Sequence, residues 1–160
     1  MTEITYDREA AVAYAKKWAF RRNPAFYDFS KIGGDCTSFA SQCIYAGAKI
    51  MNYTPTFGWF YKSANDRTPS WTGVEYLYNF LVNNDGQGPF AEEVPLAELE
   101  IGDIVQLGNS TGDFYHSPVV VGFSRGKILV AAHSYDAYNK PLSSYNFAIA
   151  RGIHILGVRK

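Results

Sequence analysis

The pattern of apolar residues changes near residue 101, and this change constrains the fold more than any other feature of the chain. Before it, apolar residues recur at helical spacing; after it, short β-branched runs alternate with turn residues. Helices followed by strands favour an α+β architecture, with N-terminal helices packed on an antiparallel β-sheet. One domain commonly holds about 100 to 200 residues. Because no repeat or low-complexity tract divides this chain, we expect a single domain over residues 1–160.

Three helices are expected before the change in pattern. They cover residues 7–22, 36–47 and 72–83. Asp7 can cap the first helix, and Thr72 and Glu75 have the spacing of a capping box at the start of the third. In the second helix the apolar face begins at Cys36 and Gly47 provides a stop, which places Cys36 in the first helical turn.

Four short β-rich runs follow. They cover residues 104–107, 117–123, 128–134 and 153–158. Only residues 124–127 separate the second run from the third, which predicts an antiparallel hairpin. His116 stands at the entry to the second run and His133 near the end of the third. The hairpin would therefore place the two histidines side by side.

The charge balance limits the partners of the chain. Fifteen Lys and Arg residues offset fifteen Asp and Glu residues, so the net charge is zero. A neutral chain lacks the broad electrostatic attraction that nucleic acid or an anionic membrane requires, and we expect neither as a partner. Because there is no apolar run of about 20 residues and no secretory signal pattern, we expect a soluble chain. The sequence indicates neither a compartment nor an oligomeric state.

Cys36 has the chemistry of a nucleophile. A thiol attacks as the thiolate, and the unpaired N–H groups at the start of a helix lower its pKa. Gly33 and Gly34 would let a substrate backbone come close, and the amide of Cys36 could donate to a developing oxyanion. The alternative is that Cys36 is a small buried apolar residue. Cys43, about 10 Å further along the helix, is expected in the core.

A cysteine nucleophile needs a base and a group that orients the base. His116 is the candidate base, and His133 is the candidate orienting residue beside it. Asp136 and Asn139 are alternatives for the orienting role, because either can accept from an imidazole N–H. His154 alternates with apolar neighbours on the last strand, and we expect it to be exposed or bonded within the sheet.

No cofactor or metal is expected from these residues. A zinc site would need ligands from four separate segments, since neither His-x-x-x-His nor Cys-x-x-Cys occurs. Gly33-Gly34 lacks the Lys-Ser/Thr ending of a phosphate-binding loop, so nucleotide binding has no support. Two cysteines are also too few for a disulfide scaffold.

The segment around Cys36 resembles a known family. Residues 33–43, which include Asp35-Cys36, are similar to the amidase domains of bacterial wall proteins, relatives of the NlpC/P60 peptidases in the papain-like superfamily. Residues 6–15 are similar to the opening helix of that family. One departure is Ser38, which stands where many relatives carry Asn.

The resemblance continues downstream and implies a fold and a site. Residues 99–105 are similar to the entry of the family's first core strand. The papain-like order is a cysteine on a helix, then a histidine, then a polar orienting residue on the next strand, and Cys36, His116 and His133 match it one by one. The resemblance implies a papain-like (NlpC/P60-like) fold and names these three residues as catalytic.

Residues and resemblance together predict a cysteine hydrolase that cleaves an amide bond without a cofactor. The resemblance implies a peptide of the bacterial wall, a peptidoglycan fragment, as the substrate. Cys36 would attack the carbonyl, and His116 would take and return the proton. The aromatic-rich stretch 53–78 either lines a groove for peptide or sugar or packs in the core. Two alternatives stay open: an acyltransferase or transamidase that uses the same thioester, and a non-catalytic wall-binding module.

Overall fold

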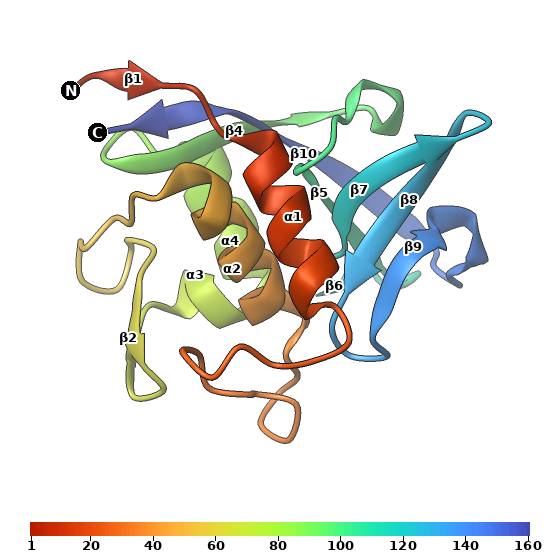
Figure 1. The fold of residues 1–160 in the computed structure, drawn as a ribbon, viewed down its shortest axis with the longest axis horizontal. Helices are drawn as coiled ribbons and strands as arrows, with labels where there is room; N and C mark the ends of the chain where they lie inside the picture. The colour runs from red at the N-terminus through yellow and green to blue at the C-terminus, as the bar shows by residue number, and fades with distance from the viewer.

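In the computed structural model, which describes residues 1–160, four helices pack against a curled antiparallel sheet (Figure 1). The helices are α1 (Arg8–Trp18), α2 (Cys36–Ala48), α3 (Pro69–Thr72) and α4 (Val74–Asn83). The α+β architecture expected from the sequence is confirmed. None of the helices has the length and apolar character needed to cross a membrane.

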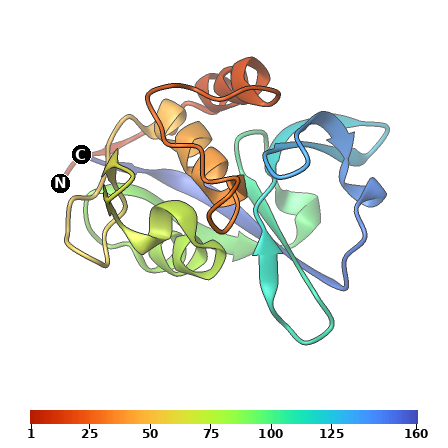
Figure 2. The same cartoon turned by 90° about the horizontal axis from the view of Figure 1, so that it is seen from below.

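Eight of the ten strands form the main sheet. The strands are β1 (Glu3–Ile4), β2 (Tyr61–Ser63), β3 (Asp66–Arg67), β4 (Gly88–Val94), β5 (Ile104–Gly108), β6 (Phe114–His116), β7 (Val119–Ser124), β8 (Lys127–Ala132), β9 (Ala137–Pro141) and β10 (Ile149–Arg159). Their order is β1-β10-β5-β7-β8-β9, with β4 paired to β10 and β6 to β5, while β2 and β3 form a separate ribbon. In Figure 2, α2 and α4 lie towards the left and β7 to β9 towards the right, and β10 crosses the view from the right to the C-terminus at the left.

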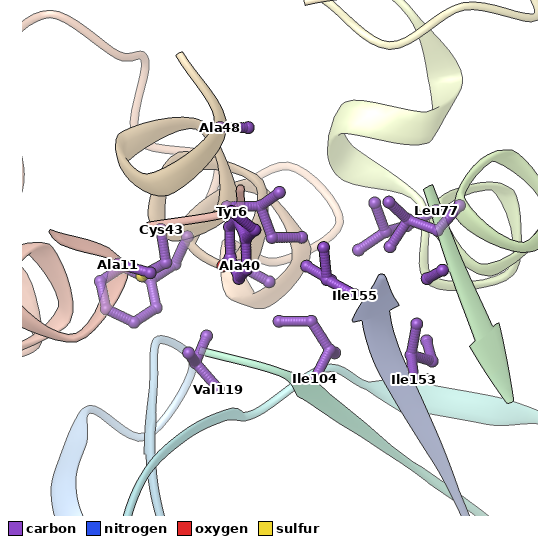
Figure 3. Close-up of a cluster of buried hydrophobic side chains, with 14 of the residues drawn as sticks. Tyr6, Ala11, Ala40, Cys43, Ala48, Leu77, Ile104, Val119, Ile153 and Ile155 are labelled. Atoms are coloured by element: carbon purple, nitrogen blue, oxygen red, sulfur yellow. The ribbon is translucent and has the colours of Figure 1, made fainter. Parts of the chain in front are cut away.

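The core joins α2 to the sheet. Figure 3 shows Ala40 and Cys43 of α2 above Ile104 of β5 and Val119 of β7, and all four side chains are fully buried. Cys43 is therefore a core residue, as predicted. Polar residues of α2 are buried as well, so this helix is enclosed on nearly every side rather than along one stripe.

The aromatic-rich stretch divides between core and surface. Trp59 and Trp71 are fully buried, with their ring centroids 4.9 Å apart. Phe57 and Tyr76 are exposed. The stretch therefore fills part of the core and also presents aromatic rings to solvent.

The first helix ends four residues earlier than the sequence predicts. Asp7 caps it as expected, since its Oδ1 accepts from the amide of Ala10 at 3.0 Å. The helix ends at Trp18 instead of Arg22. The carbonyl of Trp18 accepts from the distant His133 ring and from the amide of Arg21, a tightened last turn that the local sequence does not signal.

The third predicted helix is split. Pro69 begins α3, and Gly73 separates it from α4. Thr72 lies inside α3, where its Oγ1 accepts from Arg67 Nε at 3.2 Å. Gly73 is the N-cap residue of α4 and no side chain caps that helix, so the predicted capping box of Thr72 with Glu75 does not form.

The strand predictions are partly confirmed. Residues 104–107 lie in β5, and 153–158 lie within the longer β10. The predicted strand 117–123 instead begins at Val119, because Ser117-Pro118 separates β6 from β7. The β7–β8 hairpin forms as predicted, with Ser124 opposite Lys127. Its two turn residues, Arg125 and Gly126, both have positive φ, as a two-residue hairpin turn requires.

A buried carboxylate fixes α1 against the sheet. Asp103, at the entry to β5, is fully buried. Its Oδ1 accepts from Arg8 Nη1 of α1 at 2.7 Å and from the amide of Ile155 at 2.9 Å. Its Oδ2 accepts from His154 Nδ1 at 2.7 Å and from the amide of Glu100 at 2.8 Å. His154 is thus bonded within the sheet region, one of the two environments expected for it.

Removing this carboxylate should destabilise the fold. The Asp103→Ala protein should lose about 3 kcal/mol of unfolding free energy, since the change removes the acceptor that Arg8, His154 and two backbone amides share. Glu75→Ala is the matched control, because it breaks an ion pair with Arg151 in which the Glu75 side chain is 57% exposed. This change should lower the unfolding free energy by less than about 1 kcal/mol. Urea denaturation measures both, and equal losses would contradict the structural role of Asp103.

Candidate active site

Cys36 is the first residue of α2, as predicted. Gly33 and Gly34 precede it with φ of 82° and 98°, a left-handed backbone that favours glycine. The Cys36 sulfur lies 3.7 Å from Oγ1 of Thr37 and 3.9 Å from the carbonyl oxygen of Tyr115. Figure 2 shows the start of α2 beside the β6 segment. The thiol therefore lies against the residue that directly precedes His116.

The surroundings of Cys36 keep its thiol protonated at rest. Burial raises the pKa of the Cys36 thiol, and hydrogen bonds from Thr37 and from the backbone amide of Ser117 lower it by less. The sulfur thus contacts the backbone on both sides of His116. Free N–H groups at the start of α2 favour negative charge there. The site therefore holds a neutral thiol in a place suited to a thiolate once a base removes the proton.

His116 is the last residue of β6, opposite Leu107 of β5. Its side chain is buried, and its ring lies 5.6 Å from that of Tyr145. Burial, with a smaller contribution from the charge of Lys140, lowers the pKa of His116 from 6.5 to about 4. His116 is consequently neutral at pH 7 and able to accept a proton.

Buried polar side chains join the helix to the histidine segment. Thr37 Oγ1 and Ser117 Oγ lie 3.2 Å apart. Gln106 Nε2 donates to Ser117 Oγ at 3.1 Å and to the carbonyl of Val74 at 2.9 Å, while Arg151 Nη2 donates to Gln106 Oε1 at 2.7 Å. These bonds tie the first turn of α2 to the residue after His116. The sequence reasoning missed this network, whose one signal is a glutamine inside an apolar strand.

His133 follows directly after β8 and has both ring nitrogens bonded. Nδ1 lies 2.6 Å from Asp35 Oδ2, and Nε2 lies 2.8 Å from the carbonyl oxygen of Trp18. Both ring nitrogens therefore have hydrogen-bond partners within the protein. The ring also stacks on Phe39 of α2, with centroids 4.0 Å apart. His133 is thus fixed between α1, α2 and the residue that precedes Cys36.

Asp35 connects this histidine to Cys36. It is the N-cap residue of α2, yet its side chain makes no cap hydrogen bond. Instead Oδ1 accepts from the amide of Phe29 at 2.9 Å, and Oδ2 accepts from His133. Its own amide donates to Ser134 Oγ at 3.3 Å. Asp35 therefore holds the backbone just before Cys36 in place, a role that the sequence reasoning did not foresee.

Of the two alternative orienting residues, Asp136 lies in this neighbourhood. Arg22 donates to the Asp136 carboxylate through both terminal nitrogens, at 2.9 and 3.1 Å. Its Nη1 also lies 3.3 Å from His133 Nε2. Asn139 lies on β9 with a φ of 55°. Asp136 is thus paired with Arg22, whose Nη1 also lies against His133.

The structure places the predicted site residues in two groups of contacts. Cys36 meets the segment of His116, and His133 meets Asp35, the neighbour of Cys36. Both ring nitrogens of His133 have partners other than His116. The β7–β8 hairpin itself does not pair the two histidines, because its ladder runs from Val119 opposite Ala131 to Ser124 opposite Lys127 and includes neither.

Comparison with known proteins identifies the family of this chain. Residues 5–156 match the family described as "Putative amidase domain". The chain belongs to this amidase family. The family indicates hydrolysis of an amide bond as the class of reaction.

Most of this chain is similar to part of a longer bacterial protein. The uncharacterized protein YhbB of Bacillus subtilis (strain 168) is 37% identical over 137 residues, which cover 82% of this chain and 42% of the relative. The chain thus spans less than half the length of that relative. No solved structure gives a significant match. No three His, Cys, Asp or Glu side chains of the amidase domain lie together in a way suited to a metal ion.

Proposed function

We propose that this amidase domain is a cysteine hydrolase in which Cys36 is the nucleophile and His116 the base. The observation that carries the proposal is the thiol at the start of a buried helix, packed against the backbone on both sides of a neutral histidine. A nucleophile paired with a base of this kind is the arrangement that covalent amide hydrolysis needs.

The reaction follows from the protonation states. His116 takes the proton of the Cys36 thiol as the sulfur attacks the carbonyl carbon, and the N–H groups at the start of α2 donate to the oxyanion. The protonated His116 then gives the proton to the leaving nitrogen, and a thioester remains on Cys36. Water, deprotonated by His116, attacks the thioester and restores the thiol. Each proton taken is returned, so no cofactor is required.

The third catalytic residue of the sequence prediction, His133, enters the proposal as a positioning residue. It acts through Asp35, which precedes Cys36, and through the last carbonyl of α1. We propose the papain-like, NlpC/P60-like relation on the same basis: a cysteine that begins a helix, a histidine that ends β6, and a polar residue directly after β8.

A histidine-to-glutamine pair tests the positioning role. His133→Gln should lower kcat roughly tenfold to a hundredfold, with KM changed less than about threefold, because small misplacements of a nucleophile are costly. His154→Gln is the matched control, since His154 also donates Nδ1 to a buried carboxylate, at 2.7 Å. It should cost similar stability and leave kcat unchanged. Equal effects on kcat would reduce His133 to a structural residue.

The two cysteines should differ in reactivity. Cys43 is fully buried, and burial raises the pKa of its thiol well above the usual value. Cys36 is 9% exposed, and its sulfur lies 3.9 Å from the carbonyl oxygen of Tyr115, the residue before His116. Limited alkylation with iodoacetamide at pH 7, followed by peptide mapping, should therefore label Cys36 first. Equal or faster labelling of Cys43 would overturn the assignment of the nucleophile.

We propose a peptide of the bacterial cell wall as the substrate. The amidase family and the wall-protein resemblance support this class, and zero net charge suits a ligand that is not a polyanion. Purified protein incubated with digested peptidoglycan should release fragments by cutting an amide bond and leave the glycan strands intact, as measured by mass spectrometry with Cys36→Ala as the blank. Cleavage of sugar linkages would contradict the proposal, and transfer to an added amine without hydrolysis would reassign the domain as an acyltransferase.

A further inference from the structure

A pocket of about 540 Å³ lies between the 52–58 loop and one face of α4. Tyr76, Phe80 and Asn83 line it at helical spacing. Its volume falls in the range of small-ligand sites, about 300 to 1,000 Å³. Neither Cys36 nor His116 lines it. The pocket is thus separate from the proposed catalytic residues.

Two asparagines fix the walls of this pocket. Asn52 Nδ2 donates to the carbonyl of Gln87 at 2.9 Å, and Asn84 Nδ2 donates to the carbonyls of Gln87 at 3.0 Å and Pro89 at 2.8 Å. The backbone of Asn52 also exchanges two hydrogen bonds with Trp59, at 2.9 and 2.8 Å. The pocket is therefore already formed before any ligand arrives, which reduces the entropy cost of binding.

Other polar groups that line the pocket are free. The side-chain amide of Asn79 and the hydroxyls of Thr54 and Thr56 make no hydrogen bond within the protein, while Asn83 uses only its Nδ2. An amide and a hydroxyl each offer both a donor and an acceptor. Asp85 is the one charged residue in the lining. The pocket thus offers many neutral hydrogen-bonding groups and no cation.

Two exposed aromatic rings line the same pocket. Phe57 is 85% exposed and Tyr76 is 62% exposed. Gly73 leaves room for the Tyr76 ring, since a Cβ there would lie 2.7 Å from Tyr76 Cδ2. Tyr76 also lines a neighbouring pocket of about 360 Å³. The Tyr76 ring therefore stands at the border between the two pockets.

We propose that this pocket binds a neutral oligosaccharide. A sugar ring has an apolar C–H face, which would stack on Phe57 or Tyr76, and an edge of hydroxyls, which would bond to Asn79 and the two threonines. An anionic ligand would meet Asp85 without a balancing cation, and an apolar ligand would leave the amide groups unpaired. The inference does not depend on the chemistry of Cys36. With the proposed amide hydrolysis, it would let one domain hold a glycan and cut a peptide.

Isothermal titration of the full chain tests the proposal. The probes are N-acetylchitotetraose and maltotetraose, two neutral tetrasaccharides, and a heparin tetrasaccharide as the polyanion. At least one neutral probe should bind in a saturable way. Tyr76→Ala and Phe57→Ala should each weaken that binding about three- to tenfold, the value of one aromatic contact. Both rings are exposed, so these variants should unfold at the wild-type temperature.

Two controls separate this site from the rest of the molecule. Phe123→Ala removes another exposed ring, on β7, and should leave the affinity unchanged. Cys36→Ala should also bind as the wild type does, so that sugar binding and amide hydrolysis can succeed or fail independently. Absence of saturable binding by both neutral probes, tighter binding of heparin, or affinity unaffected by Tyr76→Ala and Phe57→Ala would overturn the proposal.

Discussion

The Cys36→Ala protein should lose at least about 10⁴-fold in kcat for amide hydrolysis, because without the sulfur no thioester forms. The change removes one atom at the start of α2 and should leave the protein folded. Release of product from a synthetic stem peptide, followed by chromatography, measures the rate, and urea denaturation checks the fold.

Cys43→Ala is the matched control for this loss. It also removes one sulfur atom from α2, but from a side chain that packs in the hydrophobic core. It should lower the unfolding free energy by about 1 kcal/mol and retain kcat within about threefold. Full activity in the Cys36→Ala protein would show that another group attacks the amide.

The second large effect should come from the base. His116→Ala should lower kcat about 10²- to 10⁴-fold, the contribution of a general base, and by more than His133→Ala. His116 titrates with a pKa of about 4, so its neutral form persists to low pH. The acid limb of kcat/KM in the wild type should consequently lie near pH 4, and activity at pH 5.5 should be nearly full. An acid limb at pH 6.5 would contradict the neutral, buried base.

Two changes check the cause of this pH profile. Lys140→Gln removes the smaller contribution to the lowered pKa of His116 and should move the acid limb upward. Because the unfolded state takes up the His116 proton at a higher pH than the folded state, folding stability should fall as the pH drops from 6.5 towards 4, by up to about 3 kcal/mol. His116→Ala should remove that fall.

The parts of the fold that local chemistry determines could be predicted from the sequence. The spacing of apolar residues after Asp35 places Cys36 at the start of a helix, and the structure agrees. The short connector at Arg125-Gly126 predicts a hairpin because it leaves only two residues between the strands. In both cases the signal lies within a few residues of the element that forms.

Elements that depend on distant partners could not be predicted. β4 contains Gly88-Pro89 and Glu92-Glu93 and lacks the alternation of a strand, yet it pairs with β10 over seven residue pairs. Long-range pairing overrides its weak local preference. The end of α1 likewise depends on His133, which lies 115 residues further along the chain from Trp18.

The candidate site shows the same division. A cysteine at the start of a helix and a histidine next to a predicted strand are local features, and the sequence indicates both. The partner of His133 could not be predicted, because Asp35 lies 98 residues away in the sequence. The position of Asp35 directly before the helix indicates a capping residue instead. The hydrogen bond of Gln106 to Ser117, the residue after His116, could not be predicted either, because it depends on how β5 and the segment after β6 pack together.

Trapping the thioester tests the nucleophilic role of Cys36 most directly. The protein would be mixed with an activated stem-peptide ester, quenched in acid, and analysed by intact-protein mass spectrometry with peptide mapping. We expect one acyl group per chain, located on Cys36, released by neutral hydroxylamine and absent from the Cys36→Ala protein. An acyl group on any other residue, or equal acylation of the Cys36→Ala protein, would contradict the proposed mechanism.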